Sequence, residues 1–327
     1  MIKKFLSLFS AAVLLGSLCA CSLTERDVVE VTKDVEVPPK MIFLGDSIAA
    51  GYGLEGYENG NNYECSSYSN ILYEKYKTEL IDICPHDMQN FAISGADSED
   101  LLTLLNSGKL DSALAQTDAV VVSIGGNDML GVMLGLLDTI GFSKETKSID
   151  LDELDFFQAA ALLMKLEENI DTALTEFEVN LKEIAAQINE KSDGKLFIQT
   201  LYDPIEALDK IPMLVDFANE KIGKFNDIIK NNSGESYIVV DVYPDFKGKC
   251  SDLTNIGELD IHPNAKGHEL IAEAVDQSFR DTGFTYTGQE YGEPHLTKFA
   301  IILIVIGIIG IILILFLIPK LFKKHDP

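Results

Sequence analysis

The sequence predicts an α/β fold in which helices cover both faces of a parallel sheet. Short apolar runs that read as strands alternate with longer stretches of helical period, which is typical of βαβ units. Four short polar motifs each lie at the end of an apolar run, so parallel strands would bring them to one edge of the sheet. The chain of 327 residues, less its apolar ends, leaves about 240 residues, enough for one domain.

The expected strands are short runs in which apolar residues predominate. In chain order they are Met41–Leu44, Gln89–Ile93, Val120–Ile124, Lys195–Gln199 and Tyr237–Val242. Polar motifs follow at least two of these runs directly, so the predicted sheet edge carries chemistry as well as turns.

Between and after these strands lie three helices with apolar stripes. The clearest runs from about Lys165 to Ile188, where apolar side chains fall three or four residues apart. Two more run from about Met213 to Ile229 and from Ala265 or Lys266 to Phe279. We expect all three stripes to pack on the sheet.

The beginning of the chain predicts a signal peptide at residues 1–20. Two lysines precede the apolar stretch Phe5–Leu18, which is short for a membrane span. The ending Leu18-Cys19-Ala20-Cys21 resembles a bacterial lipobox, which implies a lipid on Cys21. Signal cleavage at another bond and a retained anchor are the alternatives. Residues 21–39 are charged and end in Pro38-Pro39, as in an extended linker.

The end of the chain predicts a membrane helix at residues 299–318. These 20 residues carry no charge, and as a helix they would be about 30 Å long, the thickness of a hydrocarbon core. They follow a juxtamembrane linker at 283–298. The tail, 319–327, contains clustered lysines, which favour the cytoplasmic side. The domain is therefore expected outside the cell membrane.

Composition narrows the range of partners. The formal charge is −26, from 52 acidic and 26 basic residues, which argues against nucleic acid or an anionic membrane surface as the main partner. Three cysteines follow the signal, Cys65, Cys84 and Cys250. The sequence leaves two alternatives: one disulfide, for example between Cys65 and Cys250, or three buried thiols. Their spacing resembles no metal site.

The four polar motifs, taken in order, resemble the SGNH, or GDSL, hydrolase family over about residues 40 to 280. They are Gly45-Asp46-Ser47, Ser94-Gly95, Gly125-Gly126-Asn127-Asp128 and Asp260-Ile261-His262-Pro263-Asn264. The resemblance implies a three-layer, flavodoxin-like fold with a parallel five-stranded sheet over residues 40–282 and a helical insertion at about 129–164. It also implies a carboxylic ester hydrolase that works through an acyl-serine without a metal or organic cofactor.

The expected chemistry begins with Ser47, whose hydroxyl needs a base within hydrogen-bond reach. His262 is the expected base, because it stands in the loop that resembles the family. The other two histidines of the domain are weaker candidates. His268 is expected at the surface or as a helix cap, and His86 lies in a turn without a partner motif. The resemblance implies an oxyanion hole made by the backbone N–H groups of Ser47 and Gly95 and the side chain of Asn127.

The third member of a catalytic triad is open from the sequence. The family's acid usually stands three residues before the histidine, where this chain has Leu259. Asp260, which would point to the same side as His262 in an extended loop, is one alternative. Glu258 and a backbone carbonyl in a Ser-His dyad are the others. Asp46 and Asp128 are expected to accept backbone hydrogen bonds and to transfer no proton.

Two features bear on the substrate. The apolar stretch after Asp128, together with Phe156–Met164, would form either a groove for an acyl chain or an ordinary packed helix pair. Three tyrosines near the serine, Tyr52, Tyr57 and Tyr63, would either stack on sugars or cover the sheet edge.

The expected function is an extracytoplasmic, membrane-anchored serine esterase or lipase that hydrolyses acyl esters of a lipid or an acylated glycan. An O-acetylesterase of cell-wall or capsular glycans is the near alternative. A tethered glycan-binding or scaffold protein without activity is the second, motivated by the displaced acid.

Overall fold

Five parallel strands form the central sheet of this chain, in the order β4-β3-β5-β6-β7. Their bounds are Lys40–Gly45 (β3), Asp87–Asn90 (β4), Ala119–Ser123 (β5), Lys195–Gln199 (β6) and Ile238–Val240 (β7). The computed structural model describes residues 23–57, 64–129, 156–207, 212–258 and 260–322. The strand order and parallel pairing confirm the predicted fold class.

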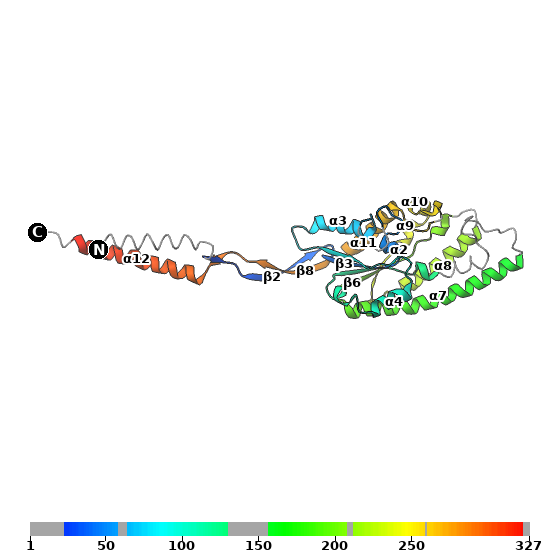
Figure 1. Cartoon of the computed structure of the whole chain (residues 1–327), viewed down its shortest axis with the longest axis horizontal. Helices are drawn as coiled ribbons and strands as arrows, with labels where there is room; N and C mark the ends of the chain where they lie inside the picture. The colour runs from blue at the N-terminus through cyan, green and yellow to red at the C-terminus, as the bar shows by residue number, and fades with distance from the viewer. Residues whose placement is uncertain (1–22, 58–63, 130–155, 208–211, 259, 323–327) are drawn as a thin grey trace. The chain divides into compact units, whose positions relative to one another are not determined.

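Helices cover both faces of the sheet, because successive side chains of each strand point to opposite faces. On one face Met41 and Phe43 pack against α3 (Tyr68–Leu80) and α11 (Ala265–Thr282). On the other face Ile42 and Leu44 pack against α4 (Ser98–Asn106), α7 (Phe156–Lys191) and α8 (Pro212–Asn231). Figure 1 shows this layering, with α3 and α11 on one side of β3 and β6, and α4 and α7 on the other.

Shorter elements complete the layers. They are α2 (Ser47–Ala50), α5 (Asp111–Leu114), η3 (Pro204–Ala207), α9 (Tyr243–Phe246), α10 (Cys250–Leu253) and η4 (Ile256–Glu258). Together with the loops that follow β3, β4, β5 and β6, several of them lie at the carboxyl edge of the sheet.

The three helices expected from the sequence are present, and one of them is longer than expected. The helix predicted from about Lys165 begins at Phe156, so residues 156–164 of the expected helical insertion lie in α7. The rest of the expected insertion, 130–155, lies outside the described residues. The strand predicted at Gln89–Ile93 ends at Asn90, since the side chain of Asn90 accepts a hydrogen bond from Ala92 N and turns the chain.

The chain divides into two units, residues 34–286 and a second made of residues 1–33 and 287–327. In the second unit β1 (Thr24–Glu25) pairs with β9 (His295–Leu296), and α12 (Lys298–Phe322) follows. Two segments expected as linkers therefore contain strands. The signal sequence and Cys21 lie outside the described residues.

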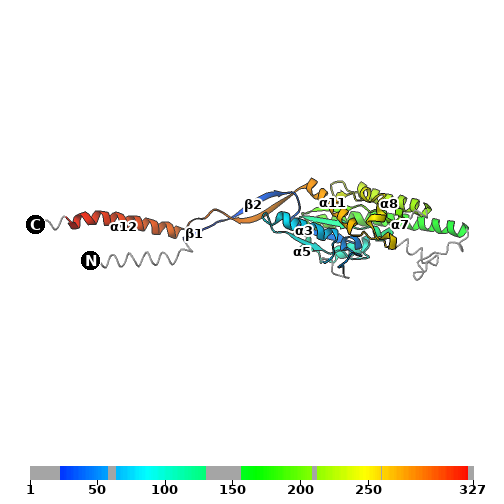
Figure 2. The same ribbon diagram turned by 90° about the horizontal axis from the view of Figure 1, so that it is seen from above.

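A second two-stranded ladder joins β2 (Val28–Val35) to β8 (Phe284–Tyr291). Both views show the two strands side by side (Figure 1 and Figure 2). The extended conformation expected for the linker before Pro38 is thus present, but the strand is paired. Helix α12 contains a stretch, Lys298–Phe316, that is long and apolar enough to cross a membrane.

Candidate active site

Ser47 stands directly after the carboxyl end of β3. The chain leaves the strand through Gly45, whose φ of 123° favours glycine. A Cβ at this position would lie 1.8 Å from the carbonyl oxygen of Ser123, so only glycine allows β3 and β5 to end this close together. The side chain of Asp46 then accepts a hydrogen bond from Ile48 N and starts α2, which presents Ser47 at the edge of the sheet.

His262 reaches Ser47 from a distant loop that neighbouring segments hold in place. Asn255 N donates to the carbonyl of His262 over 3.0 Å, and Thr254 forms an isolated bridge with Pro263. Tyr202, just after β6, donates its hydroxyl proton to the carbonyl of Ile261 over 2.8 Å. The result is a distance of 2.8 Å between His262 Nε2 and Ser47 Oγ.

Asp260 lies on the other side of the imidazole. Its carboxylate is bonded to His262 Nδ1 and also accepts from His262 N over 3.1 Å. Glu258 lies at the exposed end of η4, and Leu259 is outside the described residues. Of the two acids left open by the sequence, the structure thus brings Asp260 to His262. A serine, an imidazole and a carboxylate linked in this order can pass the serine proton to the ring and hold its tautomer.

The loops after β4 and β5 meet beside Ser47 and carry the two residues expected to bind an oxyanion. Asn127 Nδ2 donates to the carbonyl of Ala96 over 2.8 Å, which ties the Asn127 loop to the Gly95 turn. Gly95 has a φ of 87°, a backbone conformation that favours glycine.

Asp128 fixes these loops on the helices below them. Its carboxylate accepts from Ser98 N over 3.1 Å and is also bonded to Ser98 Oγ. Ser98 Oγ in turn accepts from Asn180 Nδ2 of α7 over 2.9 Å. Sequence reasoning missed Ser98 and Asn180. The Asp97-Ser98-Glu99-Asp100 run is a helix-start signal and marks Ser98 as a neighbour of the loops, but no local signal marks Asn180.

Two carboxyl groups lie under the site, of which Asp46 is buried and Asp128 half-buried. Burial raises the pKa of Asp46 to about 7, against the opposing effect of hydrogen bonds from Ile48 N and Ser123 Oγ. Burial also raises the pKa of Asp128, and its bonds to Ser98 oppose the rise. The prediction that both residues accept backbone hydrogen bonds is confirmed.

Tyr52 covers part of the imidazole. Its ring centroid lies 4.6 Å from that of His262 and 5.6 Å from that of Tyr57. The residue is 43% exposed. Its backbone N–H donates to the carbonyl of Ser47 over 3.0 Å, so the ring is held close to the serine. Tyr63 lies outside the described residues.

The other two histidines of the domain do not reach Ser47. His268 is 0% exposed, so its expected place at the surface was wrong. Its Nδ1 accepts from Tyr68 N over 3.2 Å, and burial lowers its pKa to about 3. His86 contacts the carbonyl of Pro39 near the start of β3. Cys250 is a free buried thiol, so the disulfide considered between Cys65 and Cys250 is not formed.

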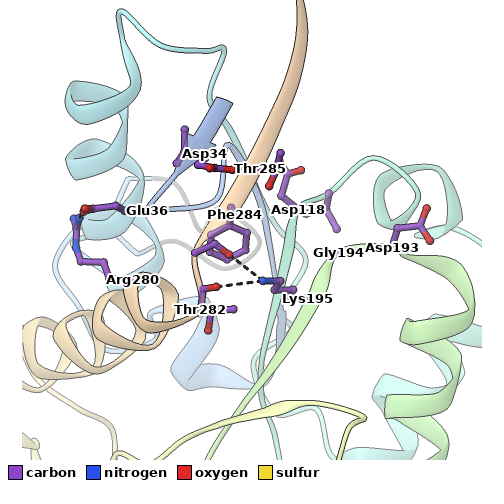
Figure 3. A pocket seen from close by; sticks show the side chains of 13 residues that line it. Asp34, Glu36, Asp118, Asp193, Gly194, Lys195, Arg280, Thr282, Phe284 and Thr285 are labelled. Atoms are coloured by element: carbon purple, nitrogen blue, oxygen red, sulfur yellow. Dashed lines mark hydrogen bonds and ion pairs between the residues drawn. The ribbon is translucent and has the colours of Figure 1, made fainter. Parts of the chain in front are cut away.

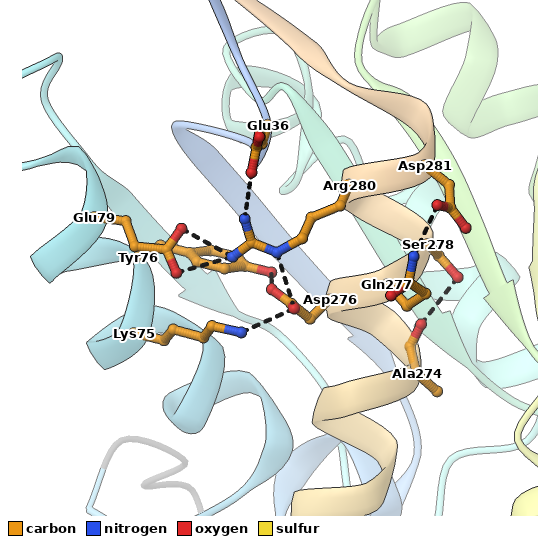
Figure 4. Close-up of polar contacts among 10 residues, drawn as sticks. All are labelled: Glu36, Lys75, Tyr76, Glu79, Ala274, Asp276, Gln277, Ser278, Arg280 and Asp281. Carbon is orange, nitrogen blue, oxygen red and sulfur yellow. Dashed lines mark hydrogen bonds and ion pairs between the residues drawn. The ribbon is translucent and has the colours of Figure 1, made fainter.

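The opposite edge of the sheet holds a cavity of about 620 Å³. Figure 3 shows Lys195 beside Phe284 among the lining residues, and the Lys195 side chain donates to the carbonyls of Thr282 and Gly283. Arg280, also at the cavity, is bonded to Glu36, Glu79 and Asp276 (Figure 4). Both cations are thus already bonded to acceptors. Because the residues that line the cavity do not combine a nucleophile with a base, we interpret it as a structural feature.

Within the described residues, no group of three His, Cys, Asp or Glu side chains could hold a metal ion. The group at the carboxyl edge instead combines a hydroxyl, a base, a carboxylate and amide donors. That set can attack a carbonyl carbon and stabilise the charge that develops on its oxygen.

Comparison with known proteins gives matches over most of the chain. The model of the GDSL-like Lipase/Acylhydrolase family matches residues 43–270. The protein YpmR of Bacillus subtilis (strain 168) is 23% identical over 288 residues, which are 86% of this chain and 97% of that protein. Spore germination lipase LipC of Bacillus licheniformis is 23% identical over 71% of this chain and 92% of that protein.

A solved structure shares the fold. The extracellular lipase of Streptomyces rimosus superimposes with a TM-score of 0.55 at 18% sequence identity, over 73% of this chain and 98% of that lipase. At this identity the likeness concerns the fold of the domain and not its substrate.

Proposed function

The chain belongs to the GDSL-like lipase/acylhydrolase family and is a carboxylic ester hydrolase, and we propose that it works as a membrane-anchored serine esterase outside the cell membrane. The resemblance seen in the four motifs is thereby confirmed at the level of the family. The proposal concerns what the family match leaves open, namely the residues that act, the substrate and the location.

The observation that supports the mechanism is the chain of contacts from Ser47 through His262 to Asp260. His262 Nε2, 2.8 Å from Ser47 Oγ, accepts the hydroxyl proton while the oxygen attacks the ester carbonyl. Asp260 holds the ring in the orientation and tautomer that leave Nε2 free to accept. No cofactor enters this scheme.

The loops beside Ser47 are proposed to stabilise the negative charge on the oxygen of the tetrahedral intermediate. The N–H groups of Ser47 and Gly95 and the amide of Asn127 are the proposed donors to the oxyanion. Asn127 Nδ2 carries two hydrogens, of which one is bonded to Ala96 O and the other remains for a substrate. His262 then returns its proton to the departing alcohol, and water releases the acyl group by the same steps in reverse.

Hydrolysis of p-nitrophenyl esters from acetate to palmitate tests this function. The full chain in detergent should turn over at least part of the series, and Ser47→Ala should fold normally and lose turnover. An optimum at medium or long chains would favour a lipase, and activity confined to acetate would favour an O-acetylesterase. Undiminished hydrolysis by the Ser47→Ala variant would sink the serine mechanism.

The O-acetylesterase of cell-wall or capsular glycans remains a second candidate because of Tyr52, an exposed aromatic ring beside the imidazole. An acid does contact His262 despite its displaced position in the sequence. This contact removes the reason for proposing a tethered binding protein without activity. Failure of a fluorophosphonate probe to label the chain would restore it.

Membrane attachment is proposed from α12 and from the segment paired with its start. Thr297 N donates to the carbonyl of Leu23 over 3.0 Å, so the residues just after Cys21 lie beside the beginning of α12. An N-terminal lipid on Cys21 and the helix would then enter the same bilayer. Deletion of residues 299–327 tests this. Retention in the membrane fraction would support the N-terminal anchor, and release into the medium would leave α12 as the sole anchor.

A further inference from the structure

Tyr52 is an exposed aromatic side chain that the mechanism above does not use. It lies in the turn after the nucleophile helix, and the bond from its N–H to Ser47 O fixes its backbone. Tyr57 supports the ring edge-on, with 5.6 Å between the two centroids. Tyr57 itself packs against the buried core. The ring of Tyr52 is therefore held at a set place beside the reacting groups while 43% of the residue stays open to solvent.

The place of Tyr52 relative to His262 tells which part of an ester it would meet. In acyl transfer the base returns its proton to the oxygen of the departing alcohol, so that oxygen must come within hydrogen-bond reach of His262 Nε2. The ring of Tyr52 lies 4.6 Å from the imidazole, centroid to centroid. Groups attached to the alcohol oxygen thus come next to Tyr52, whereas the oxyanion lies toward Asn127 and Gly95.

The same turn also contacts the acid of the triad. A Cβ built on Gly53 would lie 3.3 Å from Asp260 Oδ2 and 3.9 Å from the Cβ of His262. The turn and the histidine loop are therefore packed together at Gly53, the residue after Tyr52. Its partly open ring presents an apolar surface of fixed position, the kind on which flat rings stack.

We propose that Tyr52 is the platform for the alcohol portion of the substrate and selects esters whose alcohol carries a ring, such as a sugar or an aryl group. The inference rests on the proposed function, because it needs an ester bond between Ser47 and His262. It goes beyond that function by assigning the alcohol portion, and not the acyl chain, to a named residue.

The test keeps the acyl group constant and varies the alcohol. Ethyl acetate, benzyl acetate and methyl 6-O-acetyl-glucopyranoside are all acetates of primary alcohols, so differences in kcat/KM report on the alcohol portion. Tyr52→Ala should lower kcat/KM for at least one of the two ring-bearing esters about tenfold more than for ethyl acetate, through KM, as expected for one lost stacking contact. The ester that loses more identifies the sugar or the aryl group.

Two control variants and one ratio of activities test whether the effect comes from the ring of Tyr52. Tyr52→Phe keeps the ring and should keep the preference, and Tyr291→Ala removes a more exposed tyrosine, 73% open, from the other unit of the chain and should change nothing. The ratio of p-nitrophenyl octanoate to acetate turnover should change less than twofold in Tyr52→Ala. If that variant does not fold, Tyr52→Leu replaces it.

The outcomes separate the two levels of the proposal. Equal loss on all three acetates, with turnover still dependent on Ser47, would overturn the role of Tyr52 and leave the esterase intact. Absence of any Ser47-dependent turnover in the wild type would overturn the proposed function and the inference with it.

Discussion

The two edges of the central sheet use polar residues in opposite ways. At the carboxyl edge Ser47, His262 and Asp260 form a single chain of contacts that ends on the serine hydroxyl. At the other edge Arg280 is surrounded by three carboxylates, and Lys195 by backbone carbonyls. The second edge also carries charged side chains and a cavity of about 620 Å³, yet every cation named there is already paired. Reactivity therefore follows from an arranged nucleophile and base, and not from the amount of charge.

The largest effect should come from removing the base. We expect His262→Ala to lower kcat by about 10⁴-fold or more, because the serine hydroxyl then has no group to accept its proton. Steady-state hydrolysis of p-nitrophenyl acetate measures it. His86→Gln is the matched control, since His86 contacts Pro39 near the start of β3, and its kcat should stay within twofold. A similar loss in both variants would contradict the assignment of His262.

Asp260→Asn should have the next largest effect. An amide in place of the carboxylate favours the wrong tautomer of His262, and kcat should fall by about 10³- to 10⁴-fold. The Glu258→Gln variant changes the other acid left open by the sequence and should keep full activity. If Glu258→Gln lost the activity and Asp260→Asn kept it, the contact between Asp260 and His262 would have no catalytic meaning.

Asn127→Ala tests the donors on the other side of the serine. Loss of one oxyanion donor should lower kcat by about 10²- to 10³-fold, with a small change in KM, because the donor acts mainly in the transition state. The variant also loses the bond to Ala96 O, so its thermal unfolding should be recorded beside the kinetics. Unchanged kcat in a folded variant would remove Asn127 from the oxyanion hole.

At the opposite edge, replacing Arg280 should lower stability and leave activity unchanged. Burial raises the pKa of Asp276, but bonds from Arg280, Lys75 and Tyr76 lower it below its usual value. Arg280→Met leaves Glu36, Glu79 and Asp276 without this cation, and we expect the free energy of unfolding to fall by about 2 to 3 kcal/mol. Urea unfolding measures the loss, and kcat at low temperature should stay within twofold. A large fall in kcat of the folded variant would join the two edges functionally.

His268, in the helix that runs from one edge to the other, should give the smallest effect. Its pKa is about 3 in the fold and 6.5 in the unfolded chain, because burial disfavours the charged ring. Below pH 6.5 the unfolded chain binds the extra proton, so stability is lost as the pH falls from 6.5 toward 3. At pH 5.5 the loss from this residue should be about 1 kcal/mol.

Urea unfolding of the wild type and His268→Gln at pH 5.5 and 7.5 isolates this contribution. The glutamine cannot titrate and its side-chain oxygen can still accept from Tyr68 N, so the difference in stability between the two pH values should shrink. The same pH dependence in both proteins would show that His268 is not the group that titrates.

Sequence reasoning reached the fold and the members of the site because both have local signals. Apolar runs of strand length marked β3, β5, β6 and β7 and overlapped β4 at residues 89–90, and the motifs around Ser47 and His262 lay at recognisable turns. What it missed depends on distant contacts. Asn180 reaches Ser98 from α7 across 82 positions of sequence, and His268 is buried because α11 packs on α3. The acid was ambiguous because the choice between Asp260 and Glu258 depends on how η4 ends.

The account depends most directly on Ser47 being the activated nucleophile. Labelling of the full chain with a fluorophosphonate, followed by peptide mass spectrometry, tests this without any assumption about the substrate. We predict one phosphonylated residue, Ser47, and loss of labelling in His262→Ala. Labelling at another residue, or equal labelling of the wild type and His262→Ala, would contradict the account.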